Sequence, residues 1–137
     1  MVYLIIGSPS SGKSTYIRRH AKDGDIICDP DLIYEAIGGT DPWDPDLWVH
    51  ETALRLADQL RDIIRERSGG WKDAYVVTIA NTAEGIQRDA ERIRADIKLF
   101  IDTPMGECLR RAKDRPLPYK MLIREWHETR SFKWPMY

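Results

Sequence analysis

The chain has 137 residues, of which 42% are hydrophobic and 31% charged, and we expect a single domain over residues 1–137. The formal net charge of −1 gives no global attraction to nucleic acid or to a membrane. Because the apolar runs fall short of the roughly 20 residues of a membrane span, and Met1 leads directly into an apolar run, we expect no signal peptide and a cytoplasmic location.

Apolar runs and amphipathic segments alternate along the chain, which predicts alternating strands and helices. Asp29 is expected to cap a short helix whose first turn holds Pro30. The tail over 131–137, which contains Trp134, is expected to pack across the surface. In chain order, the pattern predicts strands over 2–6, 26–28, 75–79 and 97–101, and helices over 13–21, 32–37, 46–67, 84–94, 105–113 and 119–130.

This alternation predicts an α/β fold, in which a parallel sheet is covered by helices on both faces. Ligands of such folds bind beyond the carboxyl ends of the strands. We therefore expect the site to be formed by the segments that follow the four strands. These segments are 7–15, 29–31, 79–82 and the stretch from Asp102 onward.

Residues 7–14 fit the pattern G-x-x-x-x-G-K-[ST], the P-loop motif of nucleotide-binding proteins. Gly7 and Gly12 allow left-handed backbone and close approach to phosphate, and the backbone N–H groups form an anion nest. Lys13 is placed to contact the β- and γ-phosphates, and Ser14 to hold Mg²⁺. The alternative is a plain glycine- and serine-rich turn. The predicted nucleotide-binding residues are Gly7, Ser8, Pro9, Ser10, Ser11, Gly12, Lys13, Ser14 and Thr15.

Other features narrow the class of P-loop protein. An N-K-x-D sequence for reading guanine is missing, which disfavours a GTPase, and the strand at 75–79 ends without an acidic residue, which disfavours a motor ATPase. Arg111 and Arg115 are four residues apart and share a face if their segment is helical. Two such guanidinium groups can stabilise charge on a transferring phosphoryl group. The alternative is an exposed basic helix with salt bridges to Glu107 and Asp114, and Arg110 is expected at the surface.

Asp31 follows the second strand, beside the expected phosphate loop. A carboxylate at that place can accept a proton from an acceptor hydroxyl and orient it toward the γ-phosphate. The alternative is a first-turn acid that complements the helix dipole. Asp29 is the better capping residue, so we assign it a structural role.

With these residues in view, the chain resembles the small P-loop kinases typified by phage polynucleotide 5′-kinase, with zeta-toxin-like kinases as relatives. The resemblance rests on the loop at 7–15, on Asp31 within 29–37, and on the run 101–104 that leads to Arg111 and Arg115. It implies an AAA-type ATP-binding domain with the P-loop NTPase fold, a three-layer α/β/α arrangement whose four-stranded sheet has the order 2-3-1-4. By this likeness Lys13, Asp31, Arg111 and Arg115 are catalytic, ATP is the donor and Mg²⁺ its metal, and the two arginines form a lid.

The acceptor side departs from the family pattern. Tyr34 stands where the family often has an acceptor-contacting arginine, and Ala80 stands at the place of an acid. The segment 23–51 holds nine acidic residues and no Lys or Arg, which disfavours a polyanionic acceptor. Trp43 and Trp48 are candidates to stack on a small acceptor, and the alternative is that both pack a helix onto the core. The basic region 110–133 keeps a nucleic-acid acceptor among the alternatives.

The leading hypothesis is an ATP- and Mg²⁺-dependent kinase that phosphorylates a hydroxyl group on a nucleic-acid 5′ end, a nucleoside or another small molecule. The second hypothesis is a nucleotide-binding ATPase or switch with little transfer activity, and the third is an inactive scaffold. Cys28 and Cys108 are expected as two packed, reduced thiols. The three histidines show no metal-ligand spacing and are expected at the surface or as caps.

Overall fold

The fold is known from a computed structural model that describes residues 1–136. Over these residues, four parallel strands form one sheet in the order β2-β3-β1-β4, which confirms the predicted α/β architecture. The strands are β1 (Val2–Ile6), β2 (Ile26–Cys28), β3 (Ala74–Thr78) and β4 (Ile97–Phe100). The helices are α1 (Lys13–His20), α2 (Pro30–Ala36), α3 (Leu47–Glu66), α4 (Ala83–Ile93), α5 (Met105–Arg111) and α6 (Leu117–Thr129).

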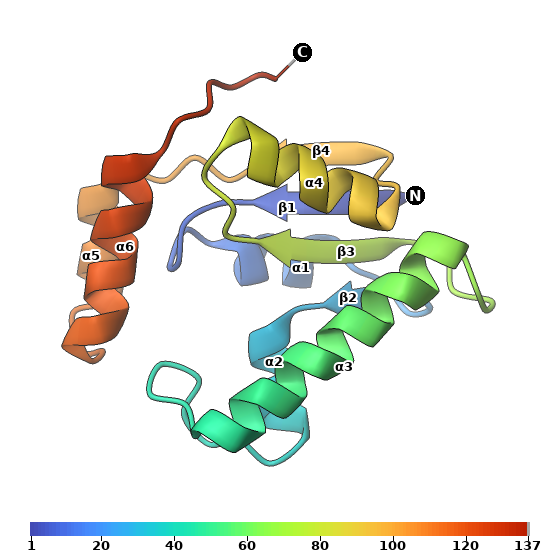
Figure 1. The fold of residues 1–137 in the computed structure, drawn as a ribbon, viewed down its shortest axis with the longest axis horizontal. Coiled ribbons are helices and arrows are strands. Elements are labelled where there is room, and N and C mark those ends of the chain that lie inside the picture. Colours follow the sequence, from blue (N-terminus) through green and yellow to red (C-terminus); the bar gives the residue numbers. More distant parts are fainter. Residues whose placement is uncertain (137) are drawn as a thin grey trace.

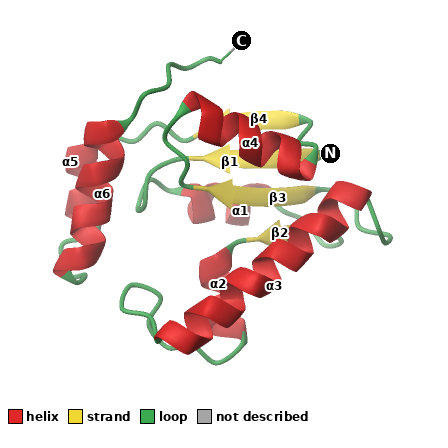
Figure 2. Ribbon diagram, viewed as in Figure 1, coloured by secondary structure: helices red, strands yellow, loops and turns green. Residues whose placement is uncertain are grey.

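The sheet is covered on both faces, with α3 and α4 on one face and α1 on the other (Figure 1). Successive side chains of β1 alternate between the two layers. Leu4 packs in the cluster that holds Ile64 of α3, whereas Ile5 packs with Ile17 of α1. The strands run toward α5 and α6, so their carboxyl ends face this pair of helices (Figure 2).

The pair α5 and α6 has an apolar cluster of its own, formed by Cys108, Ala112 and Ile123. The tail that follows α6 returns to the sheet, where Phe132 is buried and lies edge-on against Phe100 of β4, with ring centroids 5.1 Å apart. The expected packing of the tail is therefore seen up to residue 136, and Tyr137 lies outside the described residues. Both cysteines are buried and unpaired.

Two boundaries at the carboxyl end differ from expectation. α6 begins at Leu117 instead of Tyr119, because a proline in the first helical turn removes only an N–H that has no partner there. α5 ends at Arg111, so Arg115 lies in the turn between the helices and does not share a helix face with Arg111. Among residues 1–136, no helix has the length and apolar character needed to cross a membrane.

Candidate functional site

The loop between β1 and α1 has the backbone that a phosphate loop requires. Gly12 has a φ of +103°, in the left-handed region where glycine is favoured, and Ser10 has a φ of +61°. Gly7 does not need a left-handed backbone, contrary to our expectation. It is glycine because a Cβ there would lie 2.5 Å from Ser11 Oγ and 3.2 Å from the Ile101 carbonyl oxygen. Thr15, the last residue of the predicted set, is exposed in the first turn of α1.

Lys13 is folded back onto the loop that precedes it. Its Nζ donates hydrogen bonds to the carbonyl oxygens of Gly7 and Ser8, each at 2.7 Å. Desolvation lowers the pKa of Lys13 to about 8, and the nearby carboxylates of Asp29 and Asp31 oppose this shift only in part. The ammonium group therefore contacts the phosphate loop and is influenced by the charges of the two aspartates.

The two aspartates after β2 have different surroundings. Asp29 is buried and caps α2 as predicted, because its Oδ1 accepts from the Asp31 N–H at 3.0 Å. Its other oxygen, Oδ2, lies 3.4 Å from Ser14 Oγ, which places a carboxylate against the hydroxyl predicted to hold the metal. Sequence reasoning missed this second role, although the position of Asp29 directly after a strand was a signal for it.

Asp31 lies in the first turn of α2, close enough to Lys13 for their charges to influence each other. Desolvation and the charge of Asp29 raise the pKa of the Asp31 carboxyl group, while Lys13 and His50 act in the opposite direction. A raised pKa makes this carboxylate a stronger base than an ordinary aspartate.

The two arginines that follow β4 contact the phosphate loop at Ser10. Arg115 donates to Ser10 Oγ at 2.7 Å and to Tyr119 Oη at 3.1 Å. Arg111 donates to the Ser10 carbonyl oxygen at 3.3 Å. Of the sequence-predicted residues, Lys13, Arg111 and Arg115 thus contact one loop, and Asp31 lies near Lys13, although Arg115 comes from a turn and not from a helix face.

Glu107 accepts hydrogen bonds from Arg110 and Arg111, and this pairing lowers the pKa of its carboxyl group to about 2. The alternative interpretation, an exposed basic helix, predicted a salt bridge to Glu107, and this salt bridge is present. In residues 1–136 Asp114 forms no ion pair. Arg110 is exposed at the surface, as expected. Arg111 therefore donates to the Glu107 carboxylate and to the Ser10 carbonyl oxygen at the same time.

Two further side chains hold the phosphate loop and were not predicted from the sequence. Ser8 Oγ lies 3.1 Å from His127 Nε2 of α6 and 3.2 Å from Cys108 Sγ of α5. His127 is half-buried, and burial together with Arg130 lowers its pKa. These contacts connect residues a hundred or more positions apart, so no local sequence pattern indicates them.

The three aromatic residues considered for the acceptor side, Tyr34, Trp43 and Trp48, have different surroundings. Tyr34 is 3% exposed, and its Oη accepts from the Asp46 N–H at 2.9 Å, so this side chain supports the start of α3. Trp43 lies under Arg115, whose guanidinium carbon is 4.0 Å from the ring centroid. Trp48 is 73% exposed, so the alternative that both tryptophans pack onto the core is wrong for Trp48.

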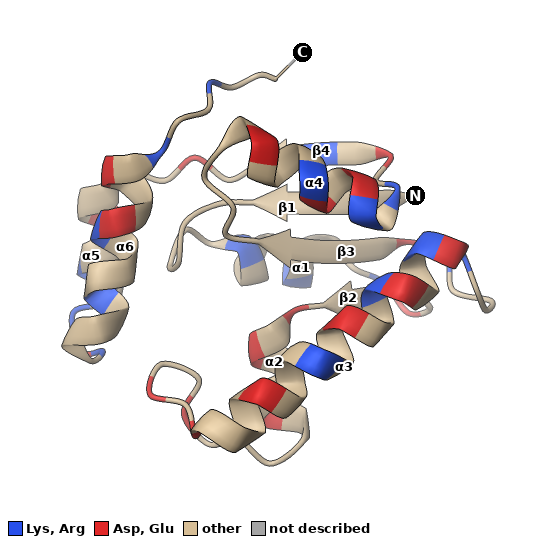
Figure 3. Ribbon diagram, in the orientation of Figure 1, with Lys and Arg blue, Asp and Glu red and all other residues tan. Residues whose placement is uncertain are grey.

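Charged residues are unevenly distributed around the site, with acidic residues on α2 and residues of both signs on α6 (Figure 3). None of the nine acidic residues over 23–51 takes part in an ion pair within the described part of the chain. The segment 110–133, which includes the end of α5 and all of α6, carries eight basic residues and three acidic ones. The site is therefore bordered by an acidic wall at α2 and the start of α3, and by a basic wall at α5 and α6.

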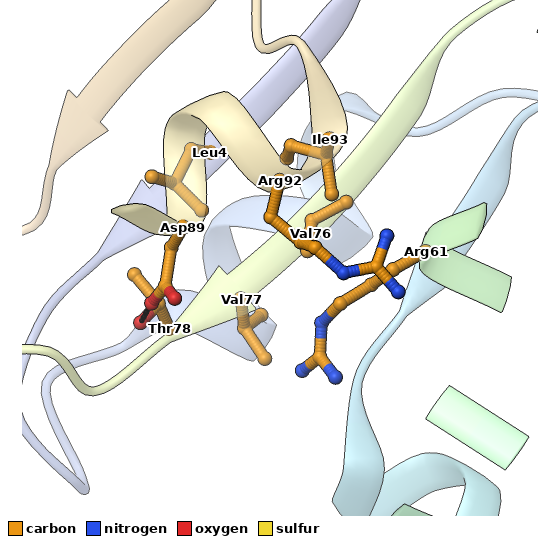
Figure 4. Close-up of a pocket in the computed structure, with 8 residues that line it drawn as sticks. All are labelled: Leu4, Arg61, Val76, Val77, Thr78, Asp89, Arg92 and Ile93. Carbon is orange, nitrogen blue, oxygen red and sulfur yellow. Dashed lines mark hydrogen bonds between the residues drawn. The ribbon is translucent and has the colours of Figure 1, made fainter. Parts of the chain in front are cut away.

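Two cavities lie near the sheet. One, of about 180 Å³, lies beside the phosphate loop and is lined by Pro9, Ile79, Asn81, Leu122, Glu125, Trp126 and Thr129. The other, of about 20 Å³, lies beneath α3 and α4, where Asp89 accepts a hydrogen bond from Thr78, and it is also lined by the side chains of Arg61 from α3 and Arg92 from α4 (Figure 4). The smaller cavity has room for about one water molecule and belongs to the packing of the helices on β3.

The model of a family described as "AAA domain" matches residues 2–125. No curated protein sequence matches the chain. A solved structure of shikimate kinase from Acinetobacter baumannii in complex with shikimate has a TM-score of 0.57 at 18% identity, over 94% of this chain and 75% of that one.

Two further likenesses come from structures of a Pnkp1/Rnl/Hen1 complex, one of them described as an RNA repair complex. The TM-scores are 0.56 and 0.64 at 18% and 17% identity, over 80% and 96% of this chain. The matches cover only 38% and 46% of those chains, so this chain spans less than half of their length. Identities this low concern the fold alone, and they support the predicted P-loop NTPase fold.

Proposed function

The chain belongs to the AAA domain family, and on that premise we propose that it is an ATP-dependent kinase that phosphorylates a hydroxyl group. The observation that carries this proposal is the position of Ser10 in the phosphate loop. Arg111 and Arg115 both donate to this residue, while Lys13 donates to the carbonyl oxygens of Gly7 and Ser8 in the same loop and interacts electrostatically with Asp31. Cations near the donor phosphates and a carboxylate near the acceptor hydroxyl are components of sites for phosphoryl transfer.

In the proposed reaction Asp31 accepts the proton of the acceptor hydroxyl, whose oxygen attacks the γ-phosphorus. The bond from the γ-phosphorus to the oxygen that bridges it to the β-phosphorus breaks, and ADP leaves with that oxygen. Lys13 exchanges its carbonyl partners for β- and γ-phosphate oxygens. Arg111 and Arg115 stabilise the negative charge on the transferring group.

Ser14 and Asp29 fit a bound Mg²⁺, because a hydroxyl and a carboxylate are the hard oxygen ligands that this ion prefers. The ion would supply positive charge to the β- and γ-phosphates. The burial of Asp29 and its contact with Ser14 keep both oxygens at the same end of the phosphate loop.

The substitution Asp31→Asn tests the assigned base. We expect kcat for phosphoryl transfer to fall by about 10²- to 10⁴-fold, the usual contribution of general base catalysis, with the Kd for ATP within about twofold of wild type. The matched control is Glu35→Gln, one turn further along α2, which should keep transfer intact. Full transfer by Asp31→Asn would show that the base is another residue.

A second candidate is a nucleotide-binding ATPase or switch with little transfer activity. Tyr34 favours it, because the position that often contacts the acceptor in related kinases is here buried against the start of α3. It predicts tight ATP binding, slow hydrolysis and no labelled product from 5′-hydroxyl oligonucleotides, nucleosides or sugars with [γ-³²P]ATP. A labelled product at multiple turnovers would exclude it.

A further inference from the structure

The larger cavity, which we call the β3–α6 groove, lies beside the phosphate loop at the carboxyl end of β3. β3 lies between β1 and β2 in the sheet, so its carboxyl end lies between the phosphate loop and the pair Asp29 and Asp31. Ile79 follows β3 and lines the groove together with Pro9 of the phosphate loop. A molecule in this groove therefore lies next to the loop that holds the donor phosphates.

The walls of the groove are held in place by hydrogen bonds between α6 and the segment after β3. The Trp126 indole N–H donates to the Ile79 carbonyl oxygen at 2.8 Å. The Asn81 amide donates to the Trp126 carbonyl oxygen at 3.1 Å and to Thr129 Oγ1 at 2.8 Å. A pocket whose walls are fixed before binding loses little conformational entropy when its ligand enters.

The groups that the groove leaves free for a ligand are apolar or negatively charged. The side chains of Ile79 and Leu122 are 56% and 49% exposed. The Glu125 carboxylate forms no ion pair and no hydrogen bond with any described residue. The seven lining residues include no Lys or Arg.

The nearby cations of the lid are already engaged. Arg115 contacts Ser10, Tyr119 and Trp43, and Arg111 contacts Ser10 and Glu107. A phosphate or carboxylate group in the groove would therefore meet an unpaired carboxylate and no free guanidinium. Burial of an anion without a partner is strongly unfavourable.

We propose that the β3–α6 groove binds a small alcohol that carries no phosphate or carboxylate group, and that Glu125 sets this preference by charge. This inference rests on the proposed kinase function for its reaction and makes that alcohol the acceptor. The volume of about 180 Å³ is below the 300–1,000 Å³ of pockets for drug-sized ligands, which suits a single sugar-sized ring.

The test uses two sets of probes that differ in charge and share a core. The first set is glucosamine, glucose and glucuronate, and the second is 3′-amino-3′-deoxyuridine, uridine and uridine 3′-monophosphate. Each probe is titrated into the ¹⁵N-labelled full chain without ATP, and ¹H–¹⁵N spectra follow the Ile79 and Asn81 amides and the Trp126 indole N–H. In at least one set we expect the cationic and neutral members to shift these signals with a Kd at least tenfold lower than that of the anionic member.

Two variants distinguish a specific effect of Glu125 from a general effect of surface charge. Glu125→Lys should reverse the order within the set that binds, so that the anionic member binds most tightly. Glu128→Lys makes the same charge change three residues further along α6, at an exposed position outside the groove lining, and should keep the wild-type order.

Several outcomes would overturn the proposal. These are an anionic member that binds wild type as tightly as its neutral partner, shifts confined to signals outside the groove, or no shift with any probe. The same probes are then incubated with [γ-³²P]ATP. Groove shifts in the expected order without any labelled probe would support the ligand site and refute the kinase reaction, so the two proposals fail separately.

Discussion

The charge of Lys13 depends strongly on its surroundings. An exposed lysine keeps its proton to a pH above 10, whereas desolvation lowers the pKa of Lys13 to about 8. Its Nζ contacts two carbonyl oxygens, which stabilise the ammonium group less than phosphate oxygens do. Bound triphosphate favours the charged form, so the pKa of Lys13 must rise when ATP binds.

This difference predicts how ATP affinity depends on pH. Below pH 8 Lys13 is already protonated, and affinity does not depend on its titration. Above pH 8 the free protein loses a proton that the complex retains, so the Kd for ATP should rise by up to tenfold per pH unit. Calorimetric titrations from pH 7 to 9.5 measure this slope. Lys13→Arg keeps its charge over that range and should remove the slope, whereas a pH-independent Kd in wild type would contradict the lowered pKa.

At the scale of elements, one contact joins the two walls of the site. Trp43 belongs to the loop between α2 and α3 on the acidic wall, and its ring packs against Arg115 of the basic wall. Arg115 lies between this ring and Tyr119, whose centroid is 5.1 Å from the guanidinium carbon. Trp43 therefore limits the orientations of a group that the proposed reaction needs over the γ-phosphate.

Trp43→Leu removes this packing and leaves Arg115 in place. We expect kcat for ATP turnover to fall by about 3- to 10-fold, in line with the ~0.5–2 kcal/mol of a cation–π contact, while KM for ATP changes less. Trp43→Phe should restore most of the loss because it keeps an aromatic face. Trp48→Leu is the matched control, since Trp48 is exposed and lies five residues further along. Equal effects of Trp43→Leu and Trp48→Leu would contradict the positioning role.

The elements themselves could be predicted because local patterns determine them. The strand order was predicted from family resemblance, and the loop at 7–14 and the cap at Asp29 follow from residues a few positions apart. The contacts of Ser8 with Cys108 and His127 could not be predicted, because they depend on how distant elements meet. Tyr34 shows the same limit, since its departure from the family pattern was visible but its packing against Asp46 was not.

At the scale of the whole molecule, the sheet and the pair α5 and α6 are two apolar units joined mainly by polar contacts. The cluster around Cys108 and Ile123 is separate from the clusters of the sheet. Apart from Trp126 and the tail, the links include hydrogen bonds to Ser8 and Ser10 of the phosphate loop and the hydrogen bond from Asn81 to Thr129. We therefore expect the pair α5 and α6 to unfold locally more readily than the central strands of the sheet.

Hydrogen exchange measures this difference and its response to nucleotide. Amides over 105–115 should exchange faster than those of β1 and β3, which are paired and covered on both sides. If Arg111 and Arg115 bind the γ-phosphate, a non-hydrolysable ATP analogue should slow hydrogen exchange over 105–115 more than ADP does. The exchange rates with the two nucleotides should differ by about tenfold or more. The amides of 7–14 contact phosphates that both nucleotides share, so they should be protected to a similar extent and serve as the internal control. Equal protection of 105–115 by the two nucleotides would place the arginines away from the γ-phosphate and remove the basis for their role in transfer.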